Sequence, residues 1–331
     1  MAQLDVIVIG ASAGGVGSLQ RVVERLPAAF PASIFIILHL PEDVRSVLPR
    51  ILTRAGNLPA AHAENGEPIE PGRIFVAPPG YHMTLEREHV RVTRGAREHG
   101  HRPAIDPLFR SAALAFGPRV IGVVLSGQLD DGTVGLMEVK RAGGVAVVQD
   151  PDDTPFQSMP RSAIAHVNVD YILPAEEIGR MLAHLVIEEE SADRLPDGRD
   201  SIVRHELASL TRHDDERDKP GAPSPYSCPD CGGVLWEVKD GELLRFRCRV
   251  GHAYNPDTLA SAQARSVEEA LWTALRALEE QAAVKKRVGE RMRRQNNDAA
   301  AEQLLRRGRE LDAHAEHVRS LLLTGIGANE P

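Results

Sequence analysis

The sequence predicts a doubly wound α/β domain with a mostly parallel sheet, followed by a small cysteine-bearing β module and a C-terminal helical hairpin. Short apolar segments alternate with amphipathic ones from residue 4 to about 187. All three cysteines then gather between residues 228 and 248, and apolar residues recur at helical spacing beyond them. We therefore expect an α/β domain over 1–187, a linker over 188–225, the module over 226–256 and the hairpin over 257–331.

Five segments of the first domain are short, β-branched and apolar on both faces, which is typical of buried parallel strands. They are Asp5–Ile9, Ser33–Leu38, Val120–Leu125, Val145–Gln149 and Tyr171–Leu173. Helical patterns lie between or after them, at Val16–Arg25, Val44–Ala55, Asp106–Ala115, Thr133–Ala142 and Ala175–Ile187. The segment 61–95 is rich in turn residues and predicts a small antiparallel excursion.

The second half of the chain begins with charged, Pro- and Gly-bearing sequence from Glu188 to Tyr226, which predicts a flexible linker. Beyond the cysteines, Ser266 and Glu269 form a capping-box pattern that predicts the start of a helix. A second helix is expected after the QNND segment. The apolar seam of this pair predicts a structural hairpin, or a surface for a homodimer or a partner; its residues are Leu271, Leu275, Leu278, Ala282, Leu304, Leu311, Ala315, Val318 and Leu322.

Composition excludes several classes of protein. Of 331 residues, 42% are hydrophobic and 26% charged, and no run of about 18 apolar residues is present, so we expect no membrane insertion. The N-terminus lacks the basic start and cleavage site of a signal peptide, which favours a cytoplasmic protein. The net charge of -8 argues against nucleic acid as a partner. Residues 221–331 carry 16 basic and 16 acidic side chains, which argues against it for the second half too.

The stretch IVIGASAGG, residues 7–15, offers two interpretations. A dinucleotide-binding loop needs G-x-G-x-x-G, but the second position after Gly10 is Ser12, and no G-K-[ST] triplet follows. The second predicted strand should also end near an acidic residue for a ribose hydroxyl, and it ends at His39. The phosphate-binding interpretation therefore fails at two places, and a nucleophilic serine becomes the better one.

Three chemically complementary side chains follow predicted strands. Ser12 follows the first strand, His39 the second, and the pair Asp130 and Asp131 the third. Because parallel strands end at one edge of a sheet, these groups can meet there. A histidine can take the serine proton, and a carboxylate can fix the imidazole tautomer. Each residue taken alone has a plainer explanation, such as a helix cap or a turn, so the coincidence of the three carries the hypothesis.

The cysteine module has the spacing of a metal site. Two residues separate Cys228 from Cys231, and three residues separate Cys248 from His252. The segments VLWEV and LLRFRC between the two pairs predict a β-hairpin that brings the pairs together. A Cys₃His set favours structural Zn²⁺ in a closed tetrahedral site, so the module is expected to be zinc-ribbon-like.

Six ordered blocks resemble the catalytic domain of the CheB family of chemotaxis protein-glutamate methylesterases. They are VIGASAGG, ILHLP, VAPPGYHM, RPAIDPLF, VVLSGQLDDG and SMPRSAI. The resemblance spans about residues 4–187 and implies a serine hydrolase with a catalytic triad. Carried over to this chain, Ser12 is the nucleophile, His39 the general base and acid, and Asp131, rather than Asp130, the orienting carboxylate. Backbone N–H groups near Ala13 and Gln128 are the candidate oxyanion donors.

The resemblance also implies a substrate and partners. The expected reaction is hydrolysis of glutamate γ-methyl esters on chemoreceptor helices, with methanol release through an acyl-serine and no catalytic cofactor. The same chemistry on glutamine would be a deamidation. A methyltransferase or another signalling protein is a further candidate partner in signal transduction. The alternative function is that of a catalytically idle adaptor that binds a receptor or methyltransferase.

Two departures from the family pattern affect these expectations. Relatives commonly carry an N-terminal receiver domain of ordinary domain size, whereas this sequence starts almost at its first predicted strand. We therefore expect no phospho-aspartate control within the chain, and the cysteine module is a candidate replacement. The residues after Gly127 are Gln128 and Leu129 where many relatives have Met-Gly, which affects the geometry expected for the oxyanion site.

Overall fold

The computed structural model describes residues 5–42, 44–188, 221–240 and 243–324. They form two compact units that divide between Leu259 and Ala260. The linker predicted for 188–225 lies almost wholly outside the described residues. Within the described ranges, no helix combines the length and the apolar character needed to cross a membrane.

A seven-stranded sheet forms the centre of the first unit, in the order β3-β4-β2-β1-β7-β8-β9. Every pair of neighbouring strands is parallel. The strands are β1 (Val6–Ala11), β2 (Ser33–Leu38), β3 (Ala60–His62), β4 (Ile74–Val76), β7 (Val120–Val124), β8 (Val145–Gln149) and β9 (Tyr171–Leu173). The apolar runs that predicted buried strands are β1, β2, β7, β8 and β9, with ends that differ by at most two residues.

The segment 61–95 differs from its prediction. Its first part supplies β3 and β4, which join the parallel sheet beside β2. Only β5 (His82–Leu85) and β6 (Val90–Thr93) form an antiparallel hairpin. The strands β3 and β4 have three residues each, which is too short for an apolar pattern to separate them from the surrounding turns.

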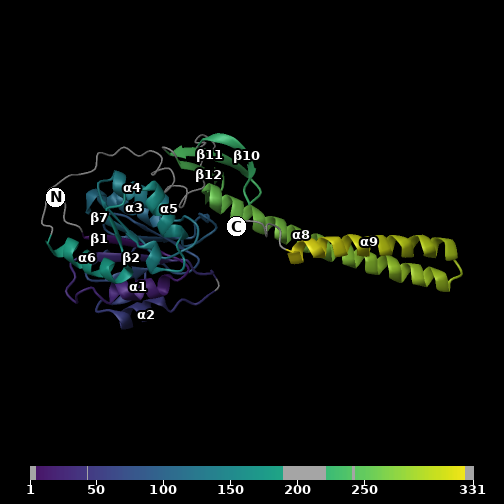
Figure 1. Cartoon of the computed structure of the whole chain (residues 1–331), viewed down its shortest axis with the longest axis horizontal. Helices are drawn as coiled ribbons and strands as arrows, with labels where there is room; N and C mark the ends of the chain where they lie inside the picture. Colours follow the sequence, from purple (N-terminus) through teal and green to yellow (C-terminus); the bar gives the residue numbers. More distant parts are fainter. Residues whose placement is uncertain (1–4, 43, 189–220, 241–242, 325–331) are drawn as a thin grey trace. The chain divides into compact units, whose positions relative to one another are not determined.

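Helices cover both faces of the sheet (Figure 1). One face packs against α1 (Gly15–Val23), α2 (Leu48–Ala55) and α6 (Ala175–Glu188), and the other against α3 (Ile105–Phe116), α4 (Thr133–Arg141) and α5 (Ser158–His166). Side chains of β1 alternate between the two cores, with Ile7 and Ile9 in the first and Val6 and Val8 in the second. The doubly wound prediction is confirmed; helix α5 was not predicted.

The cysteine module is a four-stranded antiparallel sheet in the first unit. Its strands are β10 (Ala222–Ser227), β11 (Val234–Asp240), β12 (Leu243–Cys248) and β13 (Ala253–Tyr254). Strands β11 and β12 are the predicted hairpin. Strand β10 flanks it on one side and the two-residue strand β13 on the other. Cys228 directly follows β10, and His252 directly precedes β13.

Two long helices, α8 (Pro256–Arg294) and α9 (Asp298–Thr324), form the predicted C-terminal hairpin. The predicted start at Ser266 was wrong, because α8 begins ten residues earlier. Asn255 precedes the helix, its N–H donates to Thr258 Oγ1 over 2.9 Å, and its carbonyl oxygen accepts from Leu259 N–H over 2.9 Å. This earlier capping arrangement takes the role that the sequence pattern assigned to Ser266 and Glu269.

The two helices approach closely at two glycines, one on each helix. A Cβ added to Gly289 would lie 2.9 Å from Leu305 Cγ, and one added to Gly308 would lie 2.9 Å from Lys286 Cγ. Arg293 and Glu302 form an ion pair of 3.1 Å across the hairpin. Of the predicted seam residues, Leu275, Ala282 and Ala315 are buried, and so is Ala301, which the pattern did not include.

Candidate functional site

Ser12 lies at the carboxyl edge of the central sheet, between β1 and α1. Its N–H donates to the carbonyl oxygen of Ser126, just beyond β7, over 2.9 Å. Glycines permit the close packing around it. A Cβ on Gly127 would lie 2.9 Å from Ser12 Cβ and 2.1 Å from Met159 Sδ, and Gly14 has φ 72. The turn therefore holds Ser12 half-buried against the loop that follows β7.

His39 directly follows β2, the strand beside β1. The parallel register pairs Ala11 with Leu38, and these two residues immediately precede Ser12 and His39. The His39 N–H donates to the carbonyl oxygen of Ala11 over 3.1 Å. Neighbouring strands are about 4.8 Å apart, so the sheet places the serine and the histidine at adjacent strand ends, as the sequence predicts.

Asp131 pairs with the histidine ring. His39 Nε2 and Asp131 Oδ2 are 2.8 Å apart, and the two side chains are 5% and 2% exposed. Asp131 also accepts hydrogen bonds from Ile105 N–H at 2.7 Å and Asp106 N–H at 3.0 Å, at the start of α3. Burial would raise the pKa of Asp131, but the hydrogen bond from His39, the positive charge of His99 and the amide of Ile105 hold it below its usual range.

The ring pairing assigns roles to the two nitrogens of His39. In a neutral imidazole one nitrogen donates and the other carries a lone pair. Because Asp131 is charged, it favours the tautomer in which Nε2 donates. The other nitrogen, Nδ1, is buried and has no hydrogen-bond partner among the residues that the structure describes. It can therefore act as the base that receives a hydroxyl proton.

Two residues of this site were not predicted. His99 is buried, and its Nε2 is 3.0 Å from Asp106 Oδ2 and 3.9 Å from Asp131 Oδ1. Burial favours its neutral form, but the hydrogen bond to Asp106 and the charge of Asp131 raise the pKa of His99 to about 9. Asp106 Oδ1 in turn accepts from the N–H groups of Gly132 and Gly135 at 3.0 and 2.7 Å. A cationic ring thus stands behind the Asp131 carboxylate.

His99, Asp106 and Asp131 hold ligand-type atoms within 4.8 Å of one another. These atoms are engaged in the hydrogen bonds just described, so the cluster fits an electrostatic support better than a metal site. The RPAIDPLF block contained Asp106 as a signal, whereas His99 lies outside every quoted block.

One departure from the family pattern lies in the loop after β7. Leu129 has φ 64, in the left-handed region that glycine adopts at lowest cost. A leucine there carries strain of about 1–2 kcal/mol. The N–H of Gly127 is already bound to Phe156 O over 3.0 Å, whereas the described hydrogen bonds do not engage the N–H groups of Ala13 and Gln128.

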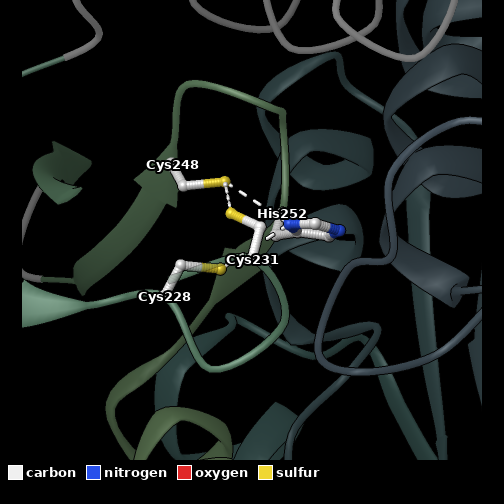
Figure 2. A group of neighbouring side chains, drawn as sticks. All are labelled: Cys228, Cys231, Cys248 and His252. Atoms are coloured by element: carbon white, nitrogen blue, oxygen red, sulfur yellow. Dashed lines mark hydrogen bonds between the residues drawn. The ribbon is translucent and has the colours of Figure 1, made fainter. Parts of the chain in front are cut away.

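The three cysteines and His252 converge in the module (Figure 2). Cys231 Sγ is 3.7 Å from Cys248 Sγ, and His252 Nδ1 is 3.6 Å from Cys228 Sγ and 3.5 Å from Cys248 Sγ. Ligands of a tetrahedral zinc, with Zn–S about 2.3 Å and Zn–N about 2.1 Å, lie about 3.8 Å (S to S) and about 3.6 Å (S to N) apart. The sulfurs are also too far apart for a disulfide bond of about 2.05 Å. The donor set and its spacing therefore fit zinc.

Tight turns present these ligands. The Cys228 N–H donates to Gly233 O over 2.7 Å, and Gly232 N–H donates to Cys228 O over 2.8 Å. On the other side, Cys248 N–H donates to His252 O over 2.9 Å. These main-chain hydrogen bonds shape both ligand loops without a contribution from a metal. Gly232, with φ 70, takes the left-handed conformation that its turn requires.

The chain is similar to known proteins over its first unit. The family described as CheB methylesterase matches residues 7–182. A protein of Leptospira interrogans is 38% identical over 182 residues, which cover 55% of this chain and 94% of that protein. Rhodospirillum rubrum protein-glutamate methylesterase/protein-glutamine glutaminase 2 is 41% identical over 176 residues, 52% of this chain and 48% of the relative. This chain therefore matches about half the length of the Rhodospirillum protein.

A solved structure gives the same result. The crystal structure of the Thermotoga maritima CheB methylesterase catalytic domain superposes with a TM-score of 0.54 at 33% identity. The match covers 98% of that domain and 55% of this chain.

Proposed function

The chain belongs to the CheB methylesterase family, and from that premise we propose that it hydrolyses glutamate γ-methyl esters of chemoreceptors and releases methanol. The observation that carries the proposal is the buried 2.8 Å pair of His39 and Asp131 at the strand end beside Ser12. The relative from Rhodospirillum rubrum is named for both ester and glutamine hydrolysis, which supports deamidation of receptor glutamines as a second reaction of the same site.

The proposed reaction begins with Ser12. Its hydroxyl oxygen attacks the ester carbonyl carbon while His39 Nδ1 takes the proton. Asp131 holds the other side of the ring and stabilises the imidazolium that forms. The oxyanion is proposed to accept hydrogen bonds from the N–H groups of Ala13 and Gln128.

The intermediate then collapses as His39 returns the proton to the leaving oxygen, so that methanol departs and an acyl-serine remains. Water attacks this ester with His39 again as base, which releases the glutamate carboxylate and restores Ser12. With a glutamine substrate the leaving group is ammonia. No step requires a cofactor.

The zinc site is proposed separately from the reaction. Cys228, Cys231, Cys248 and His252 would hold a structural zinc ion, which supplies a tetrahedral cross-link between the two ligand loops. Metal analysis of the purified chain should give one zinc per chain, and Cys248→Ser should lose it. Zinc retained in full by Cys248→Ser would contradict the ligand set.

We further propose a cytoplasmic location, binding to a methyltransferase or another signalling partner, and a homodimer through α8 and α9. A disrupted catalytic site would favour the alternative function, that of a catalytically idle adaptor. His39 and Asp131 are instead paired and buried, which supports the enzyme.

Methanol release from a methylated chemoreceptor fragment tests the proposed function. The full chain should release methanol, Ser12→Ala should abolish release while remaining folded, and Ser266→Ala, within α8, serves as the matched serine control. Absence of release from the unchanged chain, or equal release from Ser12→Ala, would contradict the proposal.

A further inference from the structure

The strand that follows the last candidate zinc ligand pairs with a loop of the catalytic domain. The carbonyl oxygen of Ala253 accepts from His99 N–H over 2.7 Å, and Ala253 N–H donates to Arg97 O over 3.3 Å. Glu98 and Ala253 thereby form a parallel bridge. Ala253, Glu98 and His99 are all buried. The contact is therefore an extension of the module sheet by one backbone segment rather than a surface touch.

That loop carries both histidines that flank the His39–Asp131 pair. His99 faces Asp106 and Asp131, as described above. Two residues later, the ring of His101 stacks on His39 with centroids 3.8 Å apart. His99 also has φ 54, an uncommon conformation that surrounding contacts must maintain. The segment 97–101 thus connects the module backbone to both members of the pair.

A residue at the start of α8 contacts the other nitrogen of the His99 ring. Thr258 Oγ1 lies 3.3 Å from His99 Nδ1, and Thr258 is 2% exposed. The same hydroxyl accepts from Asn255 N–H over 2.9 Å. The ring of His99 is therefore bound on one side by Asp106 and on the other by a residue six positions beyond His252.

A buried ion network ties β12 to the same loop. Glu98 is fully buried and pairs with Arg110 of α3 at 2.7 Å and with Arg247 of β12 at 2.9 Å. Arg247 immediately precedes the candidate ligand Cys248. Separating a buried charge from its partner is costly. We therefore expect Glu98 to follow Arg247 when the module changes its shape, so that such a change displaces the loop 97–101.

We propose that His99 is a positioning residue of the esterase and that the metal-loaded Cys₃His module holds it in place, so that loss of zinc slows ester hydrolysis. The inference rests on the proposed function for its kinetic part. Zinc binding fixes Cys248 and His252, and Ala253 follows directly. Small ligand-rich modules depend on their metal for folding, and a triad tolerates displacements of only about 0.5 Å.

Hydrogen exchange and kinetics of the full chain test this coupling. Zinc-loaded protein is compared with protein depleted by a chelator and then reloaded with zinc. Depletion should raise amide exchange over 97–101 and lower kcat by about tenfold or more, with KM changed by less than about twofold. Reloading should restore both. Faster exchange confined to 228–252, with unchanged exchange at 97–101 and unchanged kcat, would overturn the proposal.

Failure of the proposed function and failure of the coupling give different results. A zinc-loaded chain that releases no methanol contradicts the esterase activity. Amide exchange at 97–101 shows, independently of activity, whether the module and the loop are coupled.

Substitution of the Thr258 hydroxyl gives a second test with zinc kept in place. Thr258→Val should lower kcat without changing zinc content or KM, and Thr258→Ser should restore most of the rate. Thr273→Val, which removes a hydroxyl bonded to Glu269 O on the exposed part of α8, is the control and should match the unchanged chain. Wild-type kcat and wild-type exchange at 97–101 in Thr258→Val would overturn the role assigned to His99.

Discussion

The ring of His101 lies flat against the ring of His39, with centroids 3.8 Å apart and planes inclined by 14°. Asp131 fixes the same ring at its edge through Nε2. The imidazole is thus held by a face contact and by a hydrogen bond, and both come from outside its own strand. The orientation of His39 depends in this way on two loops, at 97–101 and after β7.

The two adjacent aspartates should differ sharply in importance. Asp131→Asn removes the charge that selects the Nε2–H tautomer of His39, and the expected loss in kcat is up to about 10⁴-fold. Asp130→Asn is the matched control, because Asp130 is absent from the described hydrogen bonds of His39, and it should lose less than about tenfold. Methanol release measures both. Equal losses in the two variants would contradict the assignment of Asp131.

His99 should make stability depend on alkaline pH. Burial lowers the pKa of this ring, but Asp106 and Asp131 outweigh it and raise the value to about 9, from 6.5 in an ordinary histidine. The folded chain then binds more protons than the unfolded one, so this stabilisation is complete below pH 6.5 and is lost as pH rises through about 9. Denaturant unfolding of zinc-saturated protein should show the decline.

His99→Asn provides the comparison for that experiment, since asparagine tolerates the left-handed backbone. The variant should be less stable at pH 6.5, and the difference from the unchanged chain should shrink toward pH 9. His166→Asn, at an exposed position on α5, should follow the unchanged chain. A constant difference between His99→Asn and the unchanged chain across this range would show that His99 is not the group responsible.

The C-terminal hairpin should depend on its helical glycines. Gly289→Val places a side chain where Leu305 Cγ and Ala301 O are 2.9 and 3.1 Å away, and such overpacking costs about 1–3 kcal/mol. Amide exchange over α9 should accelerate accordingly. Gly17→Val is the control, since a Cβ at this α1 glycine meets nothing within 4 Å. Unchanged exchange over α9 in Gly289→Val would contradict the packing described for the seam.

The sequence predicted those features that depend on local pattern. The strands β2 and β8 match their predicted bounds, because apolar β-branched runs ended by turn residues are unambiguous. His39 and Asp131 could be expected to meet because parallel strands share one edge. The metal ligands could be grouped because the two pairs are short motifs joined by a hairpin.

Other features depend on contacts between distant parts of the chain. The bridge between Glu98 and Ala253 joins residues 155 positions apart (253 − 98). No local sequence pattern predicts such a contact. The role of His99 follows from that bridge and from Thr258, so it could not be predicted. The start of α8 was misplaced because Asn255 and Thr258 form a cap that resembles the later pattern at Ser266.

Covalent labelling with a fluorophosphonate identifies the nucleophile of the proposed site. In the proposed site, Ser12 Oγ attacks phosphorus and displaces fluoride, so peptide mapping by mass spectrometry should place one phosphonyl group on Ser12. Labelling should fall strongly in His39→Ala, where the base is absent. The principal contrary result is a label on another serine, such as Ser126 beside it, with Ser12 unmodified and methanol release abolished.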